Sequence, residues 1–401
     1  MSKRKLTVIT NSEAQAFRDC RMKWWLGYDQ GLRPKATPKP LGFGSAYHAG
    51  VAVMYDAIGR VPADEVISYV LENGLAAIDR SLESWRDGIA GAGAFSDLAD
   101  RLDAEASEMA TLARSSFTLF VRTFREDFER CVPIAVEIPF RVPLRNASGR
   151  AMPNLVNQGV IDAVLLHIDD GDIVVHEHKT SSGSISDVER RLELDSQSAG
   201  YIHAARVVFS GRGVELAEAM KRDRPFLPRL SEAVAALSSS SVPVARIAYN
   251  VARKKIPSVP KTNKDGRVSV AAIDTLPGMY AAALQHQEAA GISITDEQRA
   301  VLANLMSKGN TFVGRVQHWR STADLDRWER ETIAVAKSIR SAERDESERY
   351  RNPGHCAMPW SLPCSYRAVC LDDAPETRSG FDVRPRHVEV EEALEAKEGG
   401  I

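Results

Sequence analysis

Residues 158–180 read Gln-Gly-Val-Ile-Asp-Ala-Val-Leu-Leu-His-Ile-Asp-Asp-Gly-Asp-Ile-Val-Val-His-Glu-His-Lys-Thr, and this stretch decides the fold. Two largely apolar runs, 159–168 and 172–179, flank the turn-forming sequence Asp-Asp-Gly, a pattern that predicts a β-hairpin. The second run passes directly from Ile-Val-Val into charged residues, as a central strand does where its end opens into a site. We therefore expect a buried hairpin with a polar, functional end.

The charged residues of this hairpin alternate along its strands. Successive side chains of a strand point to opposite faces, so Glu177 and Lys179 share one face while His176 and His178 share the other. A hairpin that pairs about its turn brings Asp162 near Glu177. Two adjacent carboxylates repel each other unless a divalent cation lies between them, and a nearby ammonium can orient a water or steady a developing negative charge. This arrangement predicts a metal-dependent phosphodiesterase site.

The order of these residues, together with two more along the chain, resembles the PD-(D/E)XK nuclease superfamily. Its elements are Gly159-x-x-Asp162, then Glu177-x-Lys179-Thr180 after fourteen residues, then Gln197-x-x-x-Tyr201. The last element is similar to a helix motif of the RecB/AddB-like branch. The resemblance implies an α/β fold with a restriction-endonuclease-like core, in which a mixed central β-sheet is flanked by helices. It also implies that Gln197 and Tyr201, which share a helix face, position DNA or the attacking water.

The sequence Gly44-Ser45-x-x-His48 resembles the motif with which this branch supplies a histidine to the catalytic metal. Imidazole is a suitable ligand beside carboxylates. The resemblance implies that one or two Mg²⁺ or Mn²⁺ ions are held by His48, Asp162, Glu177 and the backbone carbonyl of His178. Lys179 is then expected to orient the attacking water or to stabilise the charge of the transition state. A further acid, Glu137 in a predicted strand over 133–144, is expected either near this metal site or, as is commoner for a strand glutamate, facing solvent.

The five cysteines are unevenly distributed, at Cys20, Cys131, Cys356, Cys364 and Cys370. Three of them lie within fifteen residues, in a segment rich in proline and glycine that is a poor core former. In a reducing cytoplasm a disulfide framework is not expected, so the triplet indicates ligation of a metal or a cluster. Cys131 is expected to pack without ligating.

The distance between Cys20 and the C-terminal triplet resembles the iron–sulfur nucleases of this branch, including those associated with CRISPR systems. The resemblance implies a [4Fe–4S] cluster held by Cys20, Cys356, Cys364 and Cys370, which staples the ends of the domain together. The common pattern has two residues between the first pair of the triplet, whereas seven separate Cys356 from Cys364. A zinc site with His355 as a ligand is therefore the alternative.

The composition is that of a globular protein, with 401 residues, 44% of them hydrophobic and 26% charged, and a formal net charge of −2. This balance gives no global nucleic-acid signature, so contact with DNA must come from local basic patches. Residues 252–267 carry six basic side chains against one acidic, and we expect DNA contacts from Arg253, Lys254, Lys255 and Lys261. The lack of an 18-residue apolar run and of a signal peptide predicts a cytoplasmic protein with no membrane partner.

One elaborated nuclease domain is expected over residues 1–370, followed by a charged tail over 371–401 that is mobile or weakly helical. Two continuous helices are predicted over 11–25 and 188–208, and a glycine-rich turn precedes a helix that ends near residue 58. Within the domain we expect a helical N-terminal elaboration at 60–130, a catalytic core at 132–208 and 242–256, a helical region at 271–345 and a cysteine loop at 350–370.

Together these features predict a Mg²⁺- or Mn²⁺-dependent DNA exonuclease that acts on single-stranded or duplex ends in phage or bacterial replication, recombination or repair. No Gly-x-x-x-x-Gly-Lys-Ser/Thr loop is present in the sequence, so an unwinding motor would be a separate helicase or recombination partner. The alternative is a non-catalytic DNA-binding or recombination scaffold that retains the nuclease fold and an iron–sulfur or zinc staple. Such a scaffold would bind DNA equally well with and without metal.

Overall fold

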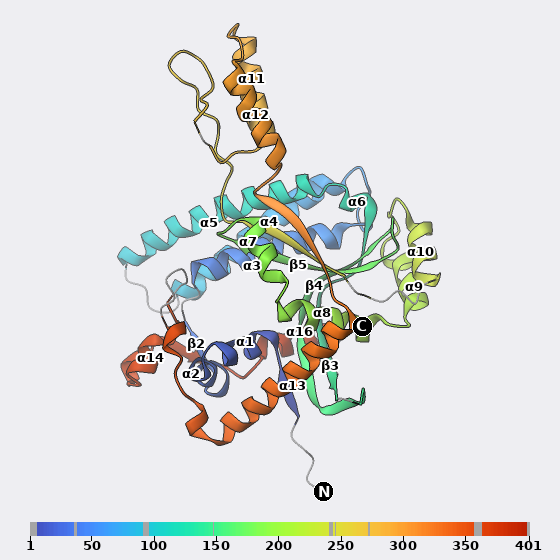
Figure 1. The fold of residues 1–401 in the computed structure, drawn as a ribbon, viewed down its shortest axis with the longest axis vertical. Helices are drawn as coiled ribbons and strands as arrows, with labels where there is room; N and C mark the ends of the chain where they lie inside the picture. The colour runs from blue at the N-terminus through green and yellow to red at the C-terminus, as the bar shows by residue number, and fades with distance from the viewer. Residues whose placement is uncertain are drawn as a thin grey trace.

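The centre of the protein is a six-stranded mixed β-sheet that is flanked by helices, and two helices project away from this body (Figure 1). The expected α/β class with a mixed central sheet is confirmed. The computed structural model describes residues 6–35, 38–90, 96–146, 148–239, 244, 246–271, 273–356 and 363–398, apart from the side chains of residues 90, 96–101, 397 and 398.

Strand β4, Ala151–His167, pairs with three other strands of the sheet. One edge of β4 pairs antiparallel with β3, Cys131–Arg145, along almost its whole length. The other edge pairs with β1, Thr7–Ile9, at residues 155–157, and with β5, Ile173–Ser181, at residues 163–166. Among the described strands, none pairs with residues 158–162 on that edge, and we call this interval of β4 the sheet gap.

Two further strands extend the sheet beyond β5. Strand β6, Arg246–Arg253, runs parallel to β5, and β7, Val313–Trp319, runs antiparallel to β6. Seven of the eight residues of β6 are buried, as expected for a strand that is covered on both faces. The sheet is therefore mixed: β1 with β4 and β5 with β6 are parallel pairs, and its other pairs are antiparallel.

One face of the sheet is covered by α3, Lys39–Ala57, and α5, Ser96–Thr123. Tyr55 of α3 and Phe120 of α5 pack against the ring of His178 at centroid distances of 5.5 and 5.9 Å. The opposite face, which carries Glu177 and Lys179, is covered by α8. The remaining helices are α1 Asn11–Asp19, α2 Arg21–Trp24, α4 Val66–Ala90, α6 Asp127–Arg130, α7 Ile185–Leu192, α8 Ser196–Phe209, α9 Gly213–Asp223, α10 Leu230–Ser239 and α13 Thr322–Arg344, with the short α14 Arg367–Leu371 and α15 Pro375–Arg378.

The two helices that project from the body form an arm between β6 and β7 (Figure 1). They are α11, Pro277–Ala289, and α12, Asp296–Lys308. The arm has a small core of its own, made by Val268, Tyr280 and Leu284, and this core is separate from the main one. The arm is thus an insertion into the sheet. None of the helices in the described ranges combines the length and the apolar character that crossing a bilayer requires.

The C-terminal segment is attached to the body. Strand β8, Phe381–Val383, pairs antiparallel with β2, Leu32–Pro34. The last helix, α16, Val388–Glu398, packs on β3 and β4, where Glu391 accepts hydrogen bonds from Arg141 and from Gln158. The sequence predicts a mobile or weakly helical tail, and the structure gives it a helix over 388–398. A count of charges could not show that Glu391 has arginine and amide partners on the sheet.

Two helices that the sequence predicts as continuous are broken. Cys20 is extended, with φ −164° and ψ 118°, so the helix expected over 11–25 divides into α1 and α2. Asp195 is also extended, and its side chain accepts the backbone N–H of Gln197, which divides the helix expected over 188–208. In the second case a local side-chain hydrogen bond competes with the helical ladder.

The glycine-rich turn expected near residue 42 is instead part of α3, which begins at Lys39. A Cβ atom at Gly42 would lie 2.5 Å from the indole ring of Trp85 on α4. Glycine at this position therefore allows two helices to pack closely, and the apparent turn signal reflects packing between helices.

Glu13 of α1 ties the C-terminal segment to the core. Its fully buried carboxylate accepts the indole N–H of Trp24 at 2.8 Å, pairs with Arg386 and lies 2.6 Å from Nε2 of His387. Burial alone would raise the pKa of Glu13, but the hydrogen bond with His387 and the charge of Arg386 outweigh it and hold this pKa below its usual value. Glu13 is therefore ionised in the folded protein at neutral pH.

We expect Glu13→Gln to lower the free energy of unfolding by about 3 to 5 kcal/mol near neutral pH, because a buried ion pair that loses one partner leaves an uncompensated charge. A carboxyl group whose pKa is lowered by folding contributes stability above its unfolded value of 4.5 and loses it as the pH falls. Urea unfolding of both proteins at several pH values should therefore show their difference shrinking below a pH of about 4.5. A difference that stays constant at lower pH would exclude the ionised carboxylate as its source.

Candidate active site

The hairpin of β4 and β5 places two carboxylates side by side at the sheet gap. Its ladder ends with the pair Ala163 and His176, so Asp162 and Glu177 are the next residues on the two strands. The backbone N–H of His178 donates to Oδ2 of Asp162 at 2.7 Å, across the point where the strands separate. The two carboxyl residues are only 9% and 3% exposed. The structure thus brings together the acids that the sequence pairs about the turn.

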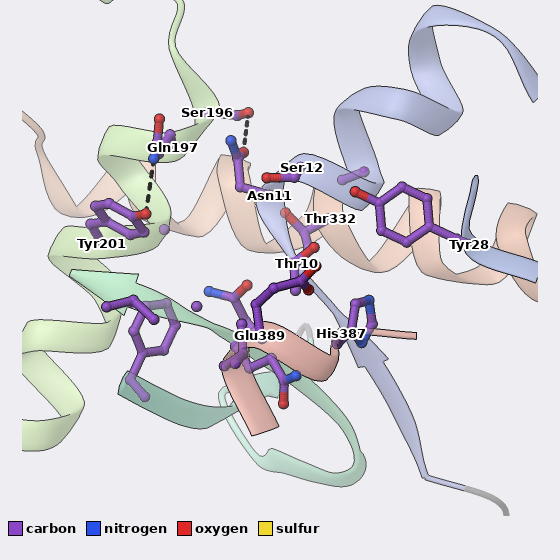
Figure 2. Close-up of a pocket in the computed structure, with 18 of the residues that line it drawn as sticks. Thr10, Asn11, Ser12, Tyr28, Ser196, Gln197, Tyr201, Thr332, His387 and Glu389 are labelled. Carbon is purple, nitrogen blue, oxygen red and sulfur yellow. Dashed lines mark hydrogen bonds between the residues drawn. The ribbon is translucent and has the colours of Figure 1, made fainter. Parts of the chain in front are cut away.

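Lys179 and two residues of α8 complete the polar cluster on this face. The Lys179 ammonium donates to Oε1 of Glu177 at 2.6 Å and to Oε1 of Gln197 at 2.7 Å. The amide nitrogen of Gln197 donates to the same Glu177 oxygen at 3.1 Å and to the hydroxyl of Tyr201 at 2.9 Å (Figure 2). The four side chains therefore form one hydrogen-bonded group, and Gln197 and Tyr201 lie on one helix face as expected.

Helix α8 is held against the cluster by its N-cap residue, Asp195. One carboxylate oxygen of Asp195 accepts the N–H of Gln197 at 2.9 Å, and the other accepts the hydroxyl of Tyr249, on β6, at 2.6 Å. The sequence analysis missed both residues. An aspartate before Ser-Gln is a cap signal that could have located Asp195, whereas the partnership with Tyr249 depends on the order of the strands.

His48 reaches the site from α3, on the side opposite to α8. Its Nδ1 lies 3.6 Å from Oδ2 of Asp162, and its ring meets the ring of His178 edge to face at a centroid distance of 5.7 Å. Burial lowers the pKa of His48, so the imidazole is neutral at pH 7 and one ring nitrogen is free of a proton. A neutral imidazole beside a carboxylate has the chemistry of a metal ligand.

The carboxylates of the site resist ionisation. Burial raises the pKa of Glu177 to about 7, and the charge of Asp162 adds to this effect. Burial also raises the pKa of Asp162 to about 6, against the N–H of His178 and the charge of Lys179. Burial by itself would lower the pKa of Lys179, but the neighbouring Glu177 outweighs it and raises this pKa, so the ammonium is charged. The cluster therefore contains one charged ammonium, that of Lys179, and this single positive charge does not offset the cost of ionising both buried carboxylates.

These residues fit a divalent cation. Oε2 of Glu177 is buried and has no hydrogen-bond partner in the part of the chain that the structure describes, and a second carboxylate, that of Asp162, lies beside it. Hard cations prefer such oxygen ligands, and Mg²⁺ usually keeps several waters. Within the described residues, no three His, Cys, Asp or Glu side chains converge closely enough to form a metal site by themselves. Backbone carbonyls and water would therefore complete the ligand set.

A buried polar network lies behind the site, on the face of α3 and α5. Nδ2 of Asn250 is 3.2 Å from Nδ1 of His176 and 3.3 Å from Nδ1 of His178. Oδ1 of Asn250 accepts from Nε of Arg315 at 2.7 Å, and Arg315 pairs with Asp127 at 2.6 Å. Burial lowers the pKa of both histidines, and the charge of Arg315 adds to it, so both rings are neutral. The sequence analysis missed this network, which joins three distant segments of the chain.

A pocket of about 420 Å³ adjoins Gln197 and Tyr201 at the sheet gap (Figure 2). Residues 158–160 of β4 and residues 10–12 at the start of α1 line it, together with residues 387, 389 and 390 of the C-terminal segment. The pocket therefore lies at the interval of β4 whose edge away from β3 has no strand partner among the described strands. It shares two side chains with the carboxylate cluster.

Glu137 of β3 lies opposite Asp162 in the strand register, because its neighbours Val136 and Ile138 pair with Ala163 and Ile161. The side chain of Glu137 is nevertheless exposed, whereas Asp162 and Glu177 are buried, so its position near the metal site stays a prediction. Its φ of 48° lies in the left-handed region, which is uncommon for a residue other than glycine. This backbone conformation marks an irregularity in β3 beside the site.

The four cysteines predicted to hold a cluster lie in one region. The N–H of Asn352 donates to Sγ of Cys20 at 3.3 Å, and Sγ of Cys356 lies 3.6 Å from the carbonyl of the same asparagine. The N–H of Cys364 donates to the carbonyl of Cys356 at 3.4 Å. Burial raises the pKa of Cys370, and the nearby Cys20 and Cys356 add to the effect. Chain segments more than 300 residues apart thus lie in one region, although among the described residues no three of these thiols converge closely enough to form a metal site by themselves.

The fifth cysteine, Cys131, lies apart from this group. It is buried at the start of β3, with its Sγ 3.7 Å from Oδ1 of Asp127. Cys131 therefore packs in the core, as expected. The loop residues 357–362, within the predicted cysteine segment, lie outside the described residues.

The basic residues predicted to contact DNA differ in their surroundings. Arg253 and Lys255 both pair with Asp274, at 3.2 and 2.8 Å. Lys254 donates to the carbonyl of Pro40 at 3.0 Å, which connects the base of the arm to α3. Lys261 is exposed on the loop before the arm helices. Three of the four side chains thus have partners within the protein, which a count of charges along the sequence could not indicate.

Fold and site together define the class of protein. A mixed sheet flanked by helices, with two acids and a lysine where a hairpin opens, fits a restriction-endonuclease-like nuclease fold. The family model of the PD-(D/E)XK nuclease superfamily matches residues 8–234, more than half of the chain, and the chain belongs to this superfamily. The match includes the hairpin and α8 but neither the arm nor the cysteine triplet. No curated protein matches the chain.

Proposed function

We propose that this protein is a Mg²⁺- or Mn²⁺-dependent DNA exonuclease of the RecB/AddB-like branch. The observation that carries the proposal is a buried oxygen of Glu177, beside Asp162 and Lys179, for which the described residues supply no hydrogen-bond partner. A buried acceptor without a partner costs about 1 to 3 kcal/mol, more when it is charged. A divalent cation removes this cost at Glu177 and offsets the negative charge of both carboxylates. His48 and the backbone carbonyl of His178 are the further ligands that we propose.

The proposed mechanism assigns separate tasks to the side chains. When bound, the divalent cation lowers the pKa of a water and offsets charge on the phosphate. Lys179, fixed between Glu177 and Gln197, stabilises the negative charge that develops on the phosphate or orients the attacking water. Burial raises the pKa of Tyr201 well above its usual value, so its hydroxyl keeps its proton and can donate to a phosphate oxygen.

The test of this function is the degradation of end-labelled linear DNA, single-stranded and duplex, by anaerobically purified protein. With Mn²⁺, wild type should release the label from one or both ends of the DNA, and with EDTA it should release neither. Lys179→Ala should be inactive. Lys221→Ala is the matched control, because Lys221 is exposed on α9 and pairs only with Glu218 among the described residues. Covalently closed circular DNA should remain intact, since an exonuclease needs an end.

Two outcomes would contradict the proposal. Nicking of the circle would show an endonuclease. Equal behaviour of wild type and Lys179→Ala, with both inert or both active, would mean that the assigned site is not used. In that case the non-catalytic DNA-binding scaffold becomes the preferred function.

The second part of the proposal is a [4Fe–4S] cluster held by Cys20, Cys356, Cys364 and Cys370. Support comes from the donor set, because four thiols from both ends of the domain gather in one region. The pairing of β2 with β8 also joins these two ends. A zinc site that includes His355 remains the alternative, since His355 lies 4.0 Å from Asp19, next to Cys20.

Anaerobically purified wild type should contain about four iron atoms and four sulfides per chain. Cys370→Ser should lose most of the iron and lower the free energy of unfolding, because the binding free energy of a structural metal is part of the folding free energy. Cys131→Ala should keep its iron, since Cys131 lies apart from the group. Metal analysis that finds zinc without iron would instead establish the zinc site.

A further inference from the structure

The pocket beside Gln197 and Tyr201 has a distinctive charge distribution. Two arginines, Arg18 and Arg33, line it together with hydroxyl and amide side chains from α1, β4 and α8. Among the described residues its lining contains one carboxylate, that of Glu389. Figure 2 shows Glu389 entering from the C-terminal segment, next to His387. Without Glu389 the lining would be cationic and rich in hydrogen-bond donors.

Glu389 is held much more weakly than Glu391 on the same helix. Its nearest cationic atom is Nε of Arg33 at 3.9 Å, and its side chain is 62% exposed. An exposed ion pair of this kind contributes about 1 kcal/mol or less. Glu391, two residues further along α16, accepts hydrogen bonds from both Arg141 and Gln158. The helix is thus anchored at Glu391, while Glu389 can be displaced by a stronger anion.

Arg33 has other contacts that hold it in place without Glu389. Its guanidinium lies over the ring of Tyr28, 5.1 Å from the centroid, and donates to the carbonyl of Gly27. Its backbone belongs to β2, which pairs with β8. The cation is therefore preorganised in the pocket wall, and binding a new anion there requires little reordering of the side chain.

We propose that this pocket binds a phosphodiester group of a DNA strand, and that Glu389 of α16 occupies the phosphate position in the DNA-free protein. Carboxylate and phosphate oxygens accept the same charge-assisted hydrogen bonds from arginine. Gln197 and Tyr201 belong to both the pocket and the carboxylate cluster, so a strand that passes the carboxylates continues into the pocket. The continuity of this path rests on the proposed nuclease function. DNA must displace Glu389 to reach Arg33, so α16 is a built-in competitor.

The experiment measures DNA binding in EDTA by anisotropy of a fluorescent single-stranded oligonucleotide, with full-length proteins. Glu389→Gln should tighten binding about two- to fivefold, because it removes a competing ion pair worth up to about 1 kcal/mol. Glu392→Gln is the matched control, since Glu392 is exposed on the same helix, does not line the pocket and gives the same change of charge. Its binding should stay close to that of wild type.

A second pair of variants tests the cation of the pocket. Arg33→Gln should weaken binding and reduce the slope of log K against log salt by about 0.7, the value for one phosphate contact on a single strand. Arg222→Gln is the control, because Arg222 is exposed on α9 and pairs with the adjacent Asp223. Hydrogen exchange at the start of α16, around Glu389, should become faster when DNA is added, because the contact of Glu389 with Arg33 is lost, while the part of the helix anchored by Glu391 should keep its protection.

Four results would overturn the proposal. Two concern the variants: equal DNA affinities of Glu389→Gln and Glu392→Gln, or equal salt slopes of the two arginine variants. The other two concern wild type: unchanged hydrogen exchange at the start of α16 on addition of DNA, or no binding of DNA. None of these measurements involves hydrolysis. A protein that fails to cut DNA, while Glu389→Gln still tightens binding, would contradict the nuclease function and leave the pocket established. A protein that cuts DNA, with no difference between the two glutamate variants, would contradict only the pocket.

Discussion

Asp162→Asn is expected to abolish both Mn²⁺ binding and DNA hydrolysis, whereas Lys179→Ala should keep the ion and lose turnover. Asparagine keeps an oxygen that can accept the N–H of His178, so the strand junction should survive. It removes the negative charge, however, and a site left with the single carboxylate of Glu177 binds a divalent cation poorly. Lys179 is not a ligand in the proposed site, and the loss of one preorganised charge stabiliser typically lowers kcat by about 10² to 10³-fold.

Calorimetric titration with Mn²⁺ and single-turnover hydrolysis of labelled DNA separate these effects. Asp223→Asn is the matched control for the charge change, because Asp223 is exposed on α9 and pairs with its neighbour Arg222. Retention of Mn²⁺ binding by Asp162→Asn would show that the paired carboxylates are not the ligands. Loss of Mn²⁺ binding by Lys179→Ala would mean that the ammonium shapes the ion site itself, and its role as a charge stabiliser would be withdrawn.

Arg315→Met is expected to lower the free energy of unfolding by about 3 to 5 kcal/mol, although it lies on the face of the sheet away from the catalytic cluster. Arg315 is largely buried, pairs with Asp127 at 2.6 Å, donates to Asn250 and lies 4.2 Å from the centroid of Phe124. Methionine keeps most of the apolar contact but leaves the buried carboxylate of Asp127 without its cation. The cost is therefore that of an uncompensated charge, which is larger than the cost of a lost hydrogen bond.

Denaturant unfolding measures this loss, with Arg114→Met as the control. Arg114 pairs with Asp79 at the surface, so its replacement should cost about 1 kcal/mol or less. The double variant Arg315→Met/Asp127→Asn should regain part of the lost stability, because it removes both charges. If the double variant is as unstable as Arg315→Met, or if Arg315→Met resembles Arg114→Met, the buried charge of Asp127 is not the source of the effect.

The parts of the site that the sequence predicts are those set by short-range periodicity. The two-residue period of a strand places Glu177 and Lys179 on one face, and the turn at 169–171 sets the register that brings Asp162 alongside. The four-residue helical spacing aligns Gln197 with Tyr201. Each of these relations involves fewer than about twenty residues of chain, so the local geometry is sufficient.

The parts that could not be predicted depend on the order of strands and on contacts between distant segments. The parallel pairing of β6 with β5 brings Asn250 beside His178 and Tyr249 beside Asp195. The sheet gap exists because β1, from the start of the chain, occupies the edge of β4 that β5 leaves. Hydrophobic pattern marks each of these strands but does not determine their order.

The attachment of both chain ends to one pocket has a consequence for synthesis of the protein. Thr10 and Asn11 form one wall of that pocket, and His387 and Glu389 form another. Glu13, which anchors the first wall, is buried against Arg386 and His387 of the second. A nascent chain that ends before these residues leaves a buried carboxylate without its cation, a state that costs several kcal/mol. The pocket can therefore form only after residues 386–389 have been translated.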